Sequence, residues 1–256
     1  MNRIVLATML ALSLGAGSAN ALRLADTAVV IPIIGRFPGA NGTQWQTDVF
    51  IANPYSPVAN VTATFYVAGA PPISKVITVG PFSDASLKDI VLNTYGSSDA
   101  AGQLILRCST SIEARARIYN TANPAGEVGQ NVPGLGLSTL RNEAFIYGLS
   151  TTVGYRVNIG VANPDDATAA IVTVRVRDMN NTLLYSQGII LQPHETRQFN
   201  DLVAAFGISP QEGVQVEFDA VGSSVIYGYA SEVRNDSGDA IFMFGTSPNV
   251  FGTGPN

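Results

Sequence analysis

The chain contains the stretch WQTDVFIANP at residues 45–54 and a related stretch, YRVNIGVANP, at residues 155–164, which lies 110 residues later. Other pairs follow in the same order at offsets of 110 to 113 residues, such as Ile33-Ile34-Gly35 with Ile146-Tyr147-Gly148 and Asp89-Ile90-Val91 with Asp201-Leu202-Val203. So narrow a range of offsets predicts two copies of one fold. Each copy spans about 110 residues, a typical size for a single domain.

Apolar and polar residues alternate within both copies, for example around Val49 and Ile51 and again around Ile159 and Val161. This period predicts strands with one face turned inward. Short runs with frequent turn signals and no long amphipathic helix predict an all-β chain of two tandem immunoglobulin-like β-sandwich domains, with a barrel as the alternative.

Turn signals between alternating runs predict hairpins in each copy. One pair of hairpins is expected to turn at residues 68–72 and 178–181. A second pair is expected within residues 102–119 and 213–232, where polar or glycine-containing stretches interrupt the alternation at 109–111 and 221–224.

Residues 1–21 have the layout of a secretory signal peptide, with Arg3 before an apolar run and small residues at Ala19 and Ala21. We expect cleavage after Ala21 and a mature protein that is secreted or periplasmic. No later segment is long and apolar enough to predict a transmembrane anchor. The two sandwich domains are then expected at residues 22–130 and 143–256, joined by a Pro- and Gly-containing linker at residues 131–142.

The composition disfavours several classes of function. The 256 residues are 46% hydrophobic and 13% charged, which is typical of a folded protein. A formal net charge of −5 disfavours binding to nucleic acid. One cysteine, Cys108, and one histidine, His194, are too few for a structural zinc site, a disulfide framework or a triad with two histidines. Cys108 alternates with apolar residues and is expected to be a small buried side chain.

Three motifs of the second copy carry a resemblance to a known family: a strand that ends in Asn163-Pro164, a segment from Pro193 to Asn200-Asp201-Leu202, and a late strand that runs into NDSGD at residues 235–239. With them the chain resembles the tandem immunoglobulin-like β-sandwich modules of secreted bacterial proteins, a family of uncertain function. The resemblance covers most of both copies, although the first copy lacks the last motif. It implies an adhesive, scaffolding or glycan-contacting role and supplies no catalytic residue.

The segment 235–239 also contains oxygen-bearing side chains of the kind that bind a hard cation such as Ca²⁺. Asp236 and Asp239 are therefore candidate Ca²⁺ ligands, and no other cofactor is indicated. The segment lacks the spacing of an EF-hand loop, and Asx turns explain the same residues without a metal.

The last strand of each copy presents Arg or Tyr side chains on its outward face: Arg115, Arg117 and Tyr119 in the first copy, and Tyr227 and Tyr229 in the second. These residue types are favoured at interfaces, because they bury a large area and keep a hydrogen-bonding tip. They are candidate contacts for a protein, a glycan or the neighbouring domain, and the alternative is a solvated sheet face.

The remaining polar residues do not form a set that predicts catalysis. Asp89 and Asp201 precede short helical segments, where a carboxylate is expected to cap the helix. His194 takes the position of Phe82 of the first copy, which favours packing over catalysis.

A duplication without a duplicated catalytic site predicts an exported, non-enzymatic module with a binding, adhesive or structural role at the cell envelope. Its partner is expected to be a protein or a glycan, and not a nucleic acid. Two alternatives remain open: a hydrolase of extracellular glycans or peptides with carboxylates between the domains, and a Ca²⁺-stabilised adhesin.

Overall fold

The structure is a computed structural model that describes residues 25–39, 42–122 and 126–247. Strands make up most of these residues and helices very few, which confirms the predicted all-β class. Helical turns are limited to α1 (Ile90–Asn93), α2 (Leu202–Phe206) and the 3₁₀ turn η2 (Leu137–Thr139). Across the described ranges no helix is long and apolar enough to cross a membrane. The predicted signal peptide, residues 1–21, lies outside them.

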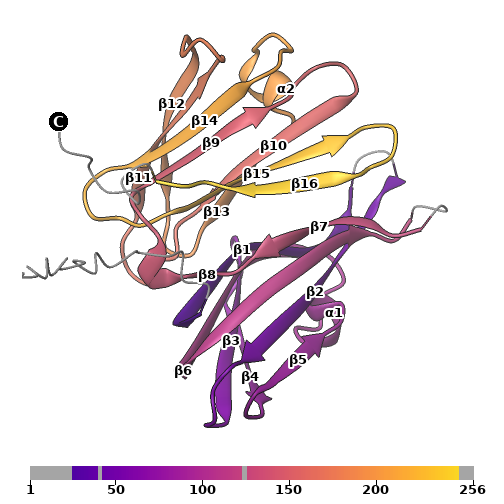
Figure 1. Ribbon diagram of the computed structural model, residues 1–256, viewed down its shortest axis with the longest axis vertical. Helices are drawn as coiled ribbons and strands as arrows, with labels where there is room; N and C mark the ends of the chain where they lie inside the picture. The colour runs from indigo at the N-terminus through magenta and orange to yellow at the C-terminus, as the bar shows by residue number, and fades with distance from the viewer. Residues whose placement is uncertain (1–24, 40–41, 123–125, 248–256) are drawn as a thin grey trace, which may run out of the picture.

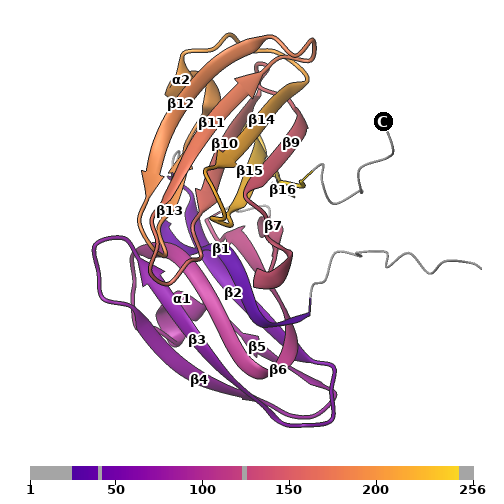
Figure 2. The same cartoon turned by 90° about the vertical axis from the view of Figure 1, so that its left-hand side faces the viewer.

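The C-terminal half consists of two four-stranded antiparallel sheets that face each other (Figures 1 and 2). Its strands are β9 (Glu143–Leu149), β10 (Tyr155–Ala162), β11 (Ala170–Arg177), β12 (Leu183–Leu191), β13 (Thr196–Phe199), β14 (Val214–Ala220), β15 (Tyr227–Arg234) and β16 (Ala240–Phe244). The strand order is β13-β10-β15-β16 in one sheet and β12-β11-β14-β9 in the other.

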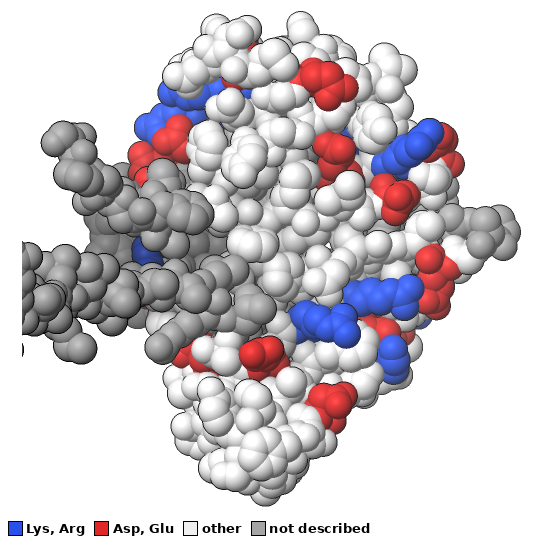
Figure 3. Space-filling model, viewed as in Figure 1, with Lys and Arg blue, Asp and Glu red and all other residues white. Residues whose placement is uncertain are grey.

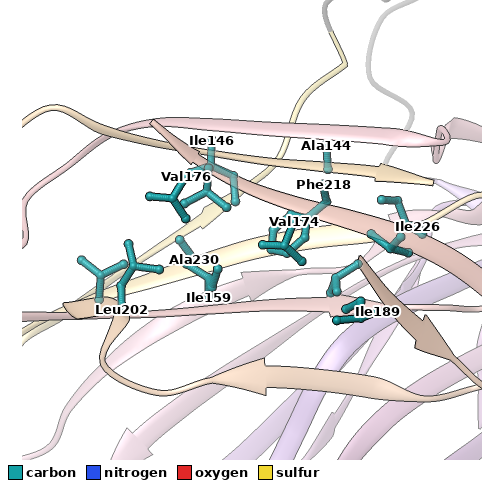
Figure 4. Packing of buried hydrophobic residues seen from close by; sticks show 14 of the residues in the cluster. Ala144, Ile146, Ile159, Val174, Val176, Ile189, Leu202, Phe218, Ile226 and Ala230 are labelled. Atoms are coloured by element: carbon teal, nitrogen blue, oxygen red, sulfur yellow. The ribbon is translucent and has the colours of Figure 1, made fainter. Parts of the chain in front are cut away.

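Side chains at every second position of both sheets fill the space between them. Ile159 and Ala230 come from one sheet, and Val174, Val176 and Phe218 come from the other (Figure 4). All five are fully buried. The period-two pattern of β-branched and aromatic residues therefore produces one dry core in this half.

The N-terminal half has a single eight-stranded sheet in which long strands pass from one layer to the other. Its strands are β1 (Asp26–Pro38), β2 (Gln44–Asn53), β3 (Ala59–Val67), β4 (Ile73–Val79), β5 (Ser83–Leu87), β6 (Ala100–Asn120), β7 (Val128–Pro133) and β8 (Leu135–Gly136). The first part of β6 pairs with β1 and β3, and its second part pairs with β2 and β7. A second core cluster fills this half, and Cys108 packs partly buried against it.

Two of the four predicted hairpins are confirmed and two are wrong. β3 pairs with β4 and β11 pairs with β12, as expected. Residues 102–119, however, belong to the single strand β6, and residues 221–224 connect β14 to β15, which lie in different sheets. Gly222 adopts a positive φ in that connection, whereas no residue at 109–111 does. Ser and Thr alone do not force a turn, so β6 continues through them.

The segment 131–142, expected to be a linker, adds strands to the N-terminal half. β7 extends to Pro133 and pairs with β6, and β8 pairs with β1. The chain then passes through η2 into β9. The connection between the halves is therefore held by backbone hydrogen bonds over much of its length.

Matching positions of the two halves make the same local contacts. Asn53 and Asn163 are both buried, and each Oδ1 accepts the backbone N–H two residues later. Each Nδ2 donates to three backbone carbonyls, those of Pro57, Val79 and Gly80 in the first half and those of Thr168, Leu191 and Gln192 in the second. The repeated Asn-Pro motif thus has a structural reason: it satisfies the buried carbonyls at one end of each half.

Candidate functional site

The two halves meet at the outer face of the β13-β10-β15-β16 sheet. A third buried cluster joins Val30, Leu135 and Leu140 of the N-terminal side to Ala162, Tyr227 and Tyr229. The Tyr227 hydroxyl donates to the carbonyl of Pro133 at 2.7 Å, and the Thr196 hydroxyl donates to that of Pro32 at 2.8 Å. Apolar burial and specific hydrogen bonds therefore fix one half against the other.

Tyr227 and Tyr229, two of the candidate partner contacts, are each 1% exposed. They do point outward from their own sheet, but the N-terminal half covers them. They contact the neighbouring half. Tyr227 is closed off from an external partner, whereas Tyr229 borders the cleft described below. Alternation along a strand identifies the face, but it does not reveal what lies against that face.

Arg115, Arg117 and Tyr119 come from the corresponding strand of the N-terminal half, where Arg115 is exposed and Arg117 is half-buried. Tyr119 is 8% exposed and its hydroxyl donates to Asp48, so its ring is not a free surface contact. The guanidinium of Arg115 stacks over Phe50 at 4.3 Å, and that of Arg117 stacks over Tyr119 at 4.6 Å. Charged side chains of both signs lie side by side on the surface drawn in Figure 3. These cation–π pairs are consistent with a solvated face.

A cleft of about 820 Å³ lies between the halves, beside their apolar contact. Aromatic rings line part of it: Phe37, Trp45, Tyr155 and Tyr229. Carboxamide side chains line another part: Gln130, Asn158, Gln198, Asn200 and Asn235. A cleft of this volume, with apolar walls and a few placed polar groups, is typical of a ligand site.

Strand ends from both halves place these side chains. Phe37 at the end of β1 pairs with Trp45 at the start of β2, so both rings lie at the same rim of the N-terminal half. Tyr155 and Asn158 come from β10 of the other half. Asp201 follows in the loop before α2, with a φ of 53°, and its carboxylate accepts the N–H of Ala204. Its predicted capping role is thus confirmed.

The matching residue Asp89 makes no side-chain cap, so the capping prediction is wrong there. Its carboxylate forms an ion pair with Arg36 instead. The backbone N–H of Asp89 donates to Asp48, just as that of Asp201 donates to Asn158. The local geometry is therefore shared, while the use of the carboxylate differs.

An internal donor holds the oxygen of every carboxamide in the cleft. The pairs are Asn158 with the Asp201 N–H (3.0 Å), Asn235 with Arg156 (2.7 Å), Gln130 with the Ser231 hydroxyl (2.8 Å), Gln198 with the Tyr229 hydroxyl (2.9 Å) and Asn200 with the Gln198 amide (2.6 Å). A backbone N–H and a guanidinium can only donate, so they fix the orientation of Asn158 and Asn235. Among the described residues, the amide nitrogens of Gln130, Asn158, Asn200 and Asn235 donate to no protein group.

Arg156 and Asp201 are the two charged residues in the lining. Burial lowers the pKa of Arg156, and the charge of Asp201 opposes that shift. Because the two charges are opposite, the lining is neutral overall. Asp201 is the single carboxylate among the described residues of the lining.

The candidate Ca²⁺ ligands do not form a cluster. Asp236 pairs with Arg234 at 2.8 Å, and the backbone N–H of Asp239 donates to the Ser237 hydroxyl at 3.2 Å. Nowhere in the part of the chain that the structure describes do three or more His, Cys, Asp or Glu residues come together as metal ligands would.

His194 packs between the halves on the other side of their contact. Its ring stacks on Tyr66 of β3 at 3.7 Å, and Nε2 lies 3.3 Å from the Asp166 carboxylate, which Arg107 also binds. Burial lowers the pKa of His194, Asp166 raises it, Arg107 lowers it and Asp165 raises it, with a net decrease.

Sequence reasoning missed most of the cleft. Trp45 and Asn158 lie in predicted strands with no further role, and Gln130 is only the last residue of the first expected domain. Asn200 and Asn235 do belong to two of the quoted motifs, but the cleft that they line exists only once the halves are placed. The one signal available was that Trp45 is the only tryptophan and lies at a strand end, where an aromatic ring is easily exposed to a ligand.

No family model and no curated protein matches the chain. Among solved structures, it is similar to a β-glucuronidase of Bacteroides uniformis, with 11% identity and a TM-score of 0.17 over 79% of this chain and 26% of that one. It is also similar to a β-glucuronidase of Parabacteroides merdae, with 12% identity and a TM-score of 0.19 over 88% of this chain and 35% of that one. The chain therefore spans about a quarter to a third of those proteins, and scores this low carry no argument about its fold or function.

Proposed function

We propose that this chain is an exported, non-enzymatic binding module built from two immunoglobulin-like β-sandwich domains, and that it binds a glycan in the cleft between them. The observation that carries the proposal is the lining of that cleft, in which aromatic rings and carboxamides of both halves lie together.

Aromatic rings and carboxamides suit a sugar for separate reasons. A sugar ring has an apolar face of C–H groups, which packs on aromatic side chains such as Trp45 and Tyr155. Its edge carries oxygens, which accept hydrogen bonds from amide N–H groups. A cleft of about 820 Å³ is large enough for several sugar rings.

Binding is favoured over hydrolysis because the lining holds one carboxylate. Most glycosidases need two carboxyl groups about 5 to 10 Å apart, one on each side of the bond that is cleaved. Asp201 has no carboxylate partner in the lining, and its oxygen caps α2. The hydrolase hypothesis would therefore need residues that the cleft does not supply.

The domain assignment and export rest on other support. The matching contacts of Asn53 and Asn163, and of Asp48 and Asn158, favour two copies of one fold. The basic, apolar and small residues of positions 1–21 favour export.

A panel of immobilised glycans tests this function. The panel should include neutral, acidic and N-acetylated oligosaccharides, and the wild-type chain is compared with Trp45→Ala and Phe50→Ala. We expect binding that Trp45→Ala weakens at least about tenfold, because the ring that packs on the sugar is lost. Phe50→Ala removes an aromatic side chain outside the cleft and should bind like the wild type.

Because Trp45 also packs against the core, the exposed variant Asn200→Ala serves as a second test and is expected to fold normally. A wild-type protein that binds no glycan of the panel would refute the proposal. So would shortened products after incubation with a bound glycan, which would show an enzyme.

A further inference from the structure

We propose that the cleft selects neutral oligosaccharides that carry acetamido groups, as N-acetylhexosamines do. This inference rests on the proposed function and names the ligand class of the same site. It follows from the direction of the hydrogen-bonding groups in the lining, the apolar wall beside them and the balance of charge.

The cleft offers more donors than acceptors. Internal donors hold the oxygens of all five carboxamides, and four amide nitrogens are left without a protein partner among the described residues. An acetamido carbonyl accepts hydrogen bonds and brings no proton of its own to satisfy. A sugar hydroxyl brings a proton with each oxygen, and that proton has to compete for the one lone pair that each carboxamide oxygen has left.

The acetamido N–H needs one acceptor, and the lining contains a suitable one. Asp201 accepts a long bond of 3.5 Å from Ala204 through Oδ1, and its second oxygen accepts no hydrogen bond from the described residues. One carboxylate among several amide donors matches the single N–H of an acetamido group beside its carbonyl.

An apolar wall matches the acetamido methyl group. Ile33, Ile118 and Val233 belong to the same lining as Trp45. Transfer of one methyl group from water to such a wall is favourable. A hydroxyl at the same position of the sugar would gain nothing from these side chains.

The charge of the lining favours a neutral ligand. Arg156 and Asp201 cancel each other, and Arg156 already donates to Asn235. The chain as a whole has a formal net charge of −5, so its field repels anions. Acidic saccharides therefore receive no electrostatic support here.

At the position of the N-terminal half that corresponds to Asn158, protein groups occupy both side-chain atoms, and none is left for a ligand. Asp48 corresponds to Asn158, and each accepts the backbone N–H of the matching Asp through Oδ1. The second oxygen of Asp48 accepts a hydrogen bond from Lys88 at 2.7 Å. Asn200 stands at the position of Lys88 in the second half, and Nδ2 of Asn158 is left for a ligand.

Titration calorimetry with two matched tetrasaccharides tests the inference directly. Chitotetraose and cellotetraose share one β-1,4-linked backbone and differ at the 2-position, which carries an acetamido group in the first and a hydroxyl in the second. We expect chitotetraose to bind at least about tenfold more tightly, which corresponds to 1.4 kcal/mol. Tetragalacturonate is an acidic tetrasaccharide with a different, α-1,4-linked backbone and is expected to bind more weakly than either.

The variant Asn158→Asp replaces the free amide donor by an acceptor of the same shape. Asp48 shows that an aspartate at this position keeps the backbone hydrogen bond, so the variant should fold. We expect it to lose at least about tenfold in affinity for chitotetraose, since a donor to the carbonyl becomes an unpaired carboxylate oxygen. Asn131→Asp, an exposed position on β7 outside the cleft, is the control and should bind as the wild type does.

The outcomes separate this inference from the proposed function. Equal affinity for chitotetraose and cellotetraose, or tighter binding of tetragalacturonate, would overturn the acetamido inference and leave a glycan-binding cleft. An Asn158→Asp variant that binds chitotetraose like the wild type would overturn it as well. Failure of all saccharides to bind would refute both.

Discussion

Corresponding sheet faces of the two halves differ in exposure: one faces solvent, and the other is buried against the neighbouring half. In the N-terminal half, Phe50 and Arg115 face each other across β2 and β6 and stack at the surface. At the matching positions of the C-terminal half, Gly160 faces Tyr229 across β10 and β15. A Cβ on Gly160 would lie 2.2 Å from the Tyr229 ring, so the ring lies flat over the strand and is buried beneath the N-terminal half.

This difference shows how similar pairs of strands yield both a solvated face and an interface. In the N-terminal half, Arg115 covers the ring of Phe50 and remains exposed to solvent. In the C-terminal half, Gly160 leaves space for the ring of Tyr229, which packs against the N-terminal half. The cleft lies beside this interface, and among the described residues the solvated face has no corresponding cleft.

The largest expected effect comes from the two facing residues themselves. Tyr229→Ala removes a fully buried ring and should lower the free energy of unfolding by about 3–5 kcal/mol. Arg115→Ala at the matching position should lower it by less than about 1 kcal/mol, because an exposed cation–π pair is weak. Urea denaturation of both variants measures the difference. Equal losses would contradict the distinction between interface and solvated face.

The second comparison concerns Asp48 and Asn158. Asp48→Ala leaves the Asp89 N–H, the Lys88 ammonium and the Tyr119 hydroxyl without their shared acceptor, and should cost about 2–4 kcal/mol of stability. Asn158→Ala leaves one backbone N–H without its acceptor and should cost about 1 kcal/mol. Thermal and urea unfolding of the pair test this order. A larger loss of stability for Asn158→Ala than for Asp48→Ala would contradict this order.

The pH dependence of stability sharpens the same comparison. Burial raises the pKa of Asp48, but the Lys88 and Asp89 hydrogen bonds, the charge of Lys88 and the Tyr119 hydroxyl outweigh it, so the folded pKa is lowered. The stabilisation is therefore complete above the unfolded pKa of about 3.9 and is lost as the pH falls through the folded value.

Asp48→Asn removes this titration. The variant should lose about 1–2 kcal/mol at pH 7 and should lose less additional stability than the wild type between pH 5 and pH 2. Urea midpoints across that range provide the measurement, with Asn158→Asp as the reciprocal variant. An equal loss of stability between pH 5 and pH 2 for the wild type and Asp48→Asn would contradict this prediction.

The smallest expected effect concerns a single hydroxyl at the interface. Tyr227→Phe removes the hydrogen bond to Pro133 and should cost about 0.5–1.5 kcal/mol. Tyr147→Phe, at an exposed tyrosine, is the matched control and should stay within about 0.5 kcal/mol of the wild type. A control that loses as much as Tyr227→Phe would remove the argument for this interface bond.

Sequence periodicity was sufficient for the all-β class, the inward residues such as Val49 and Ile159, and the hairpins at 68–72 and 178–181. It was misleading where polar residues interrupt a strand, because Ser109-Thr110-Ser111 can stay extended while Gly222 turns the chain. The cleft could not be predicted, since its lining joins Trp45 to residues more than 100 positions away. That pairing depends on how two folded halves pack, and no local pattern encodes it.

Trp45 also provides the most direct test of the central claim, that a saccharide binds between the halves. It is the only tryptophan of the chain and it lines the cleft, so its fluorescence reports on that site alone. Titration with chitotetraose should produce a saturable blue shift, with a midpoint equal to the calorimetric dissociation constant, as the sugar displaces water from the indole. Tryptophan emission that stays unchanged at concentrations where calorimetry shows saturation would place the ligand elsewhere and contradict the claim.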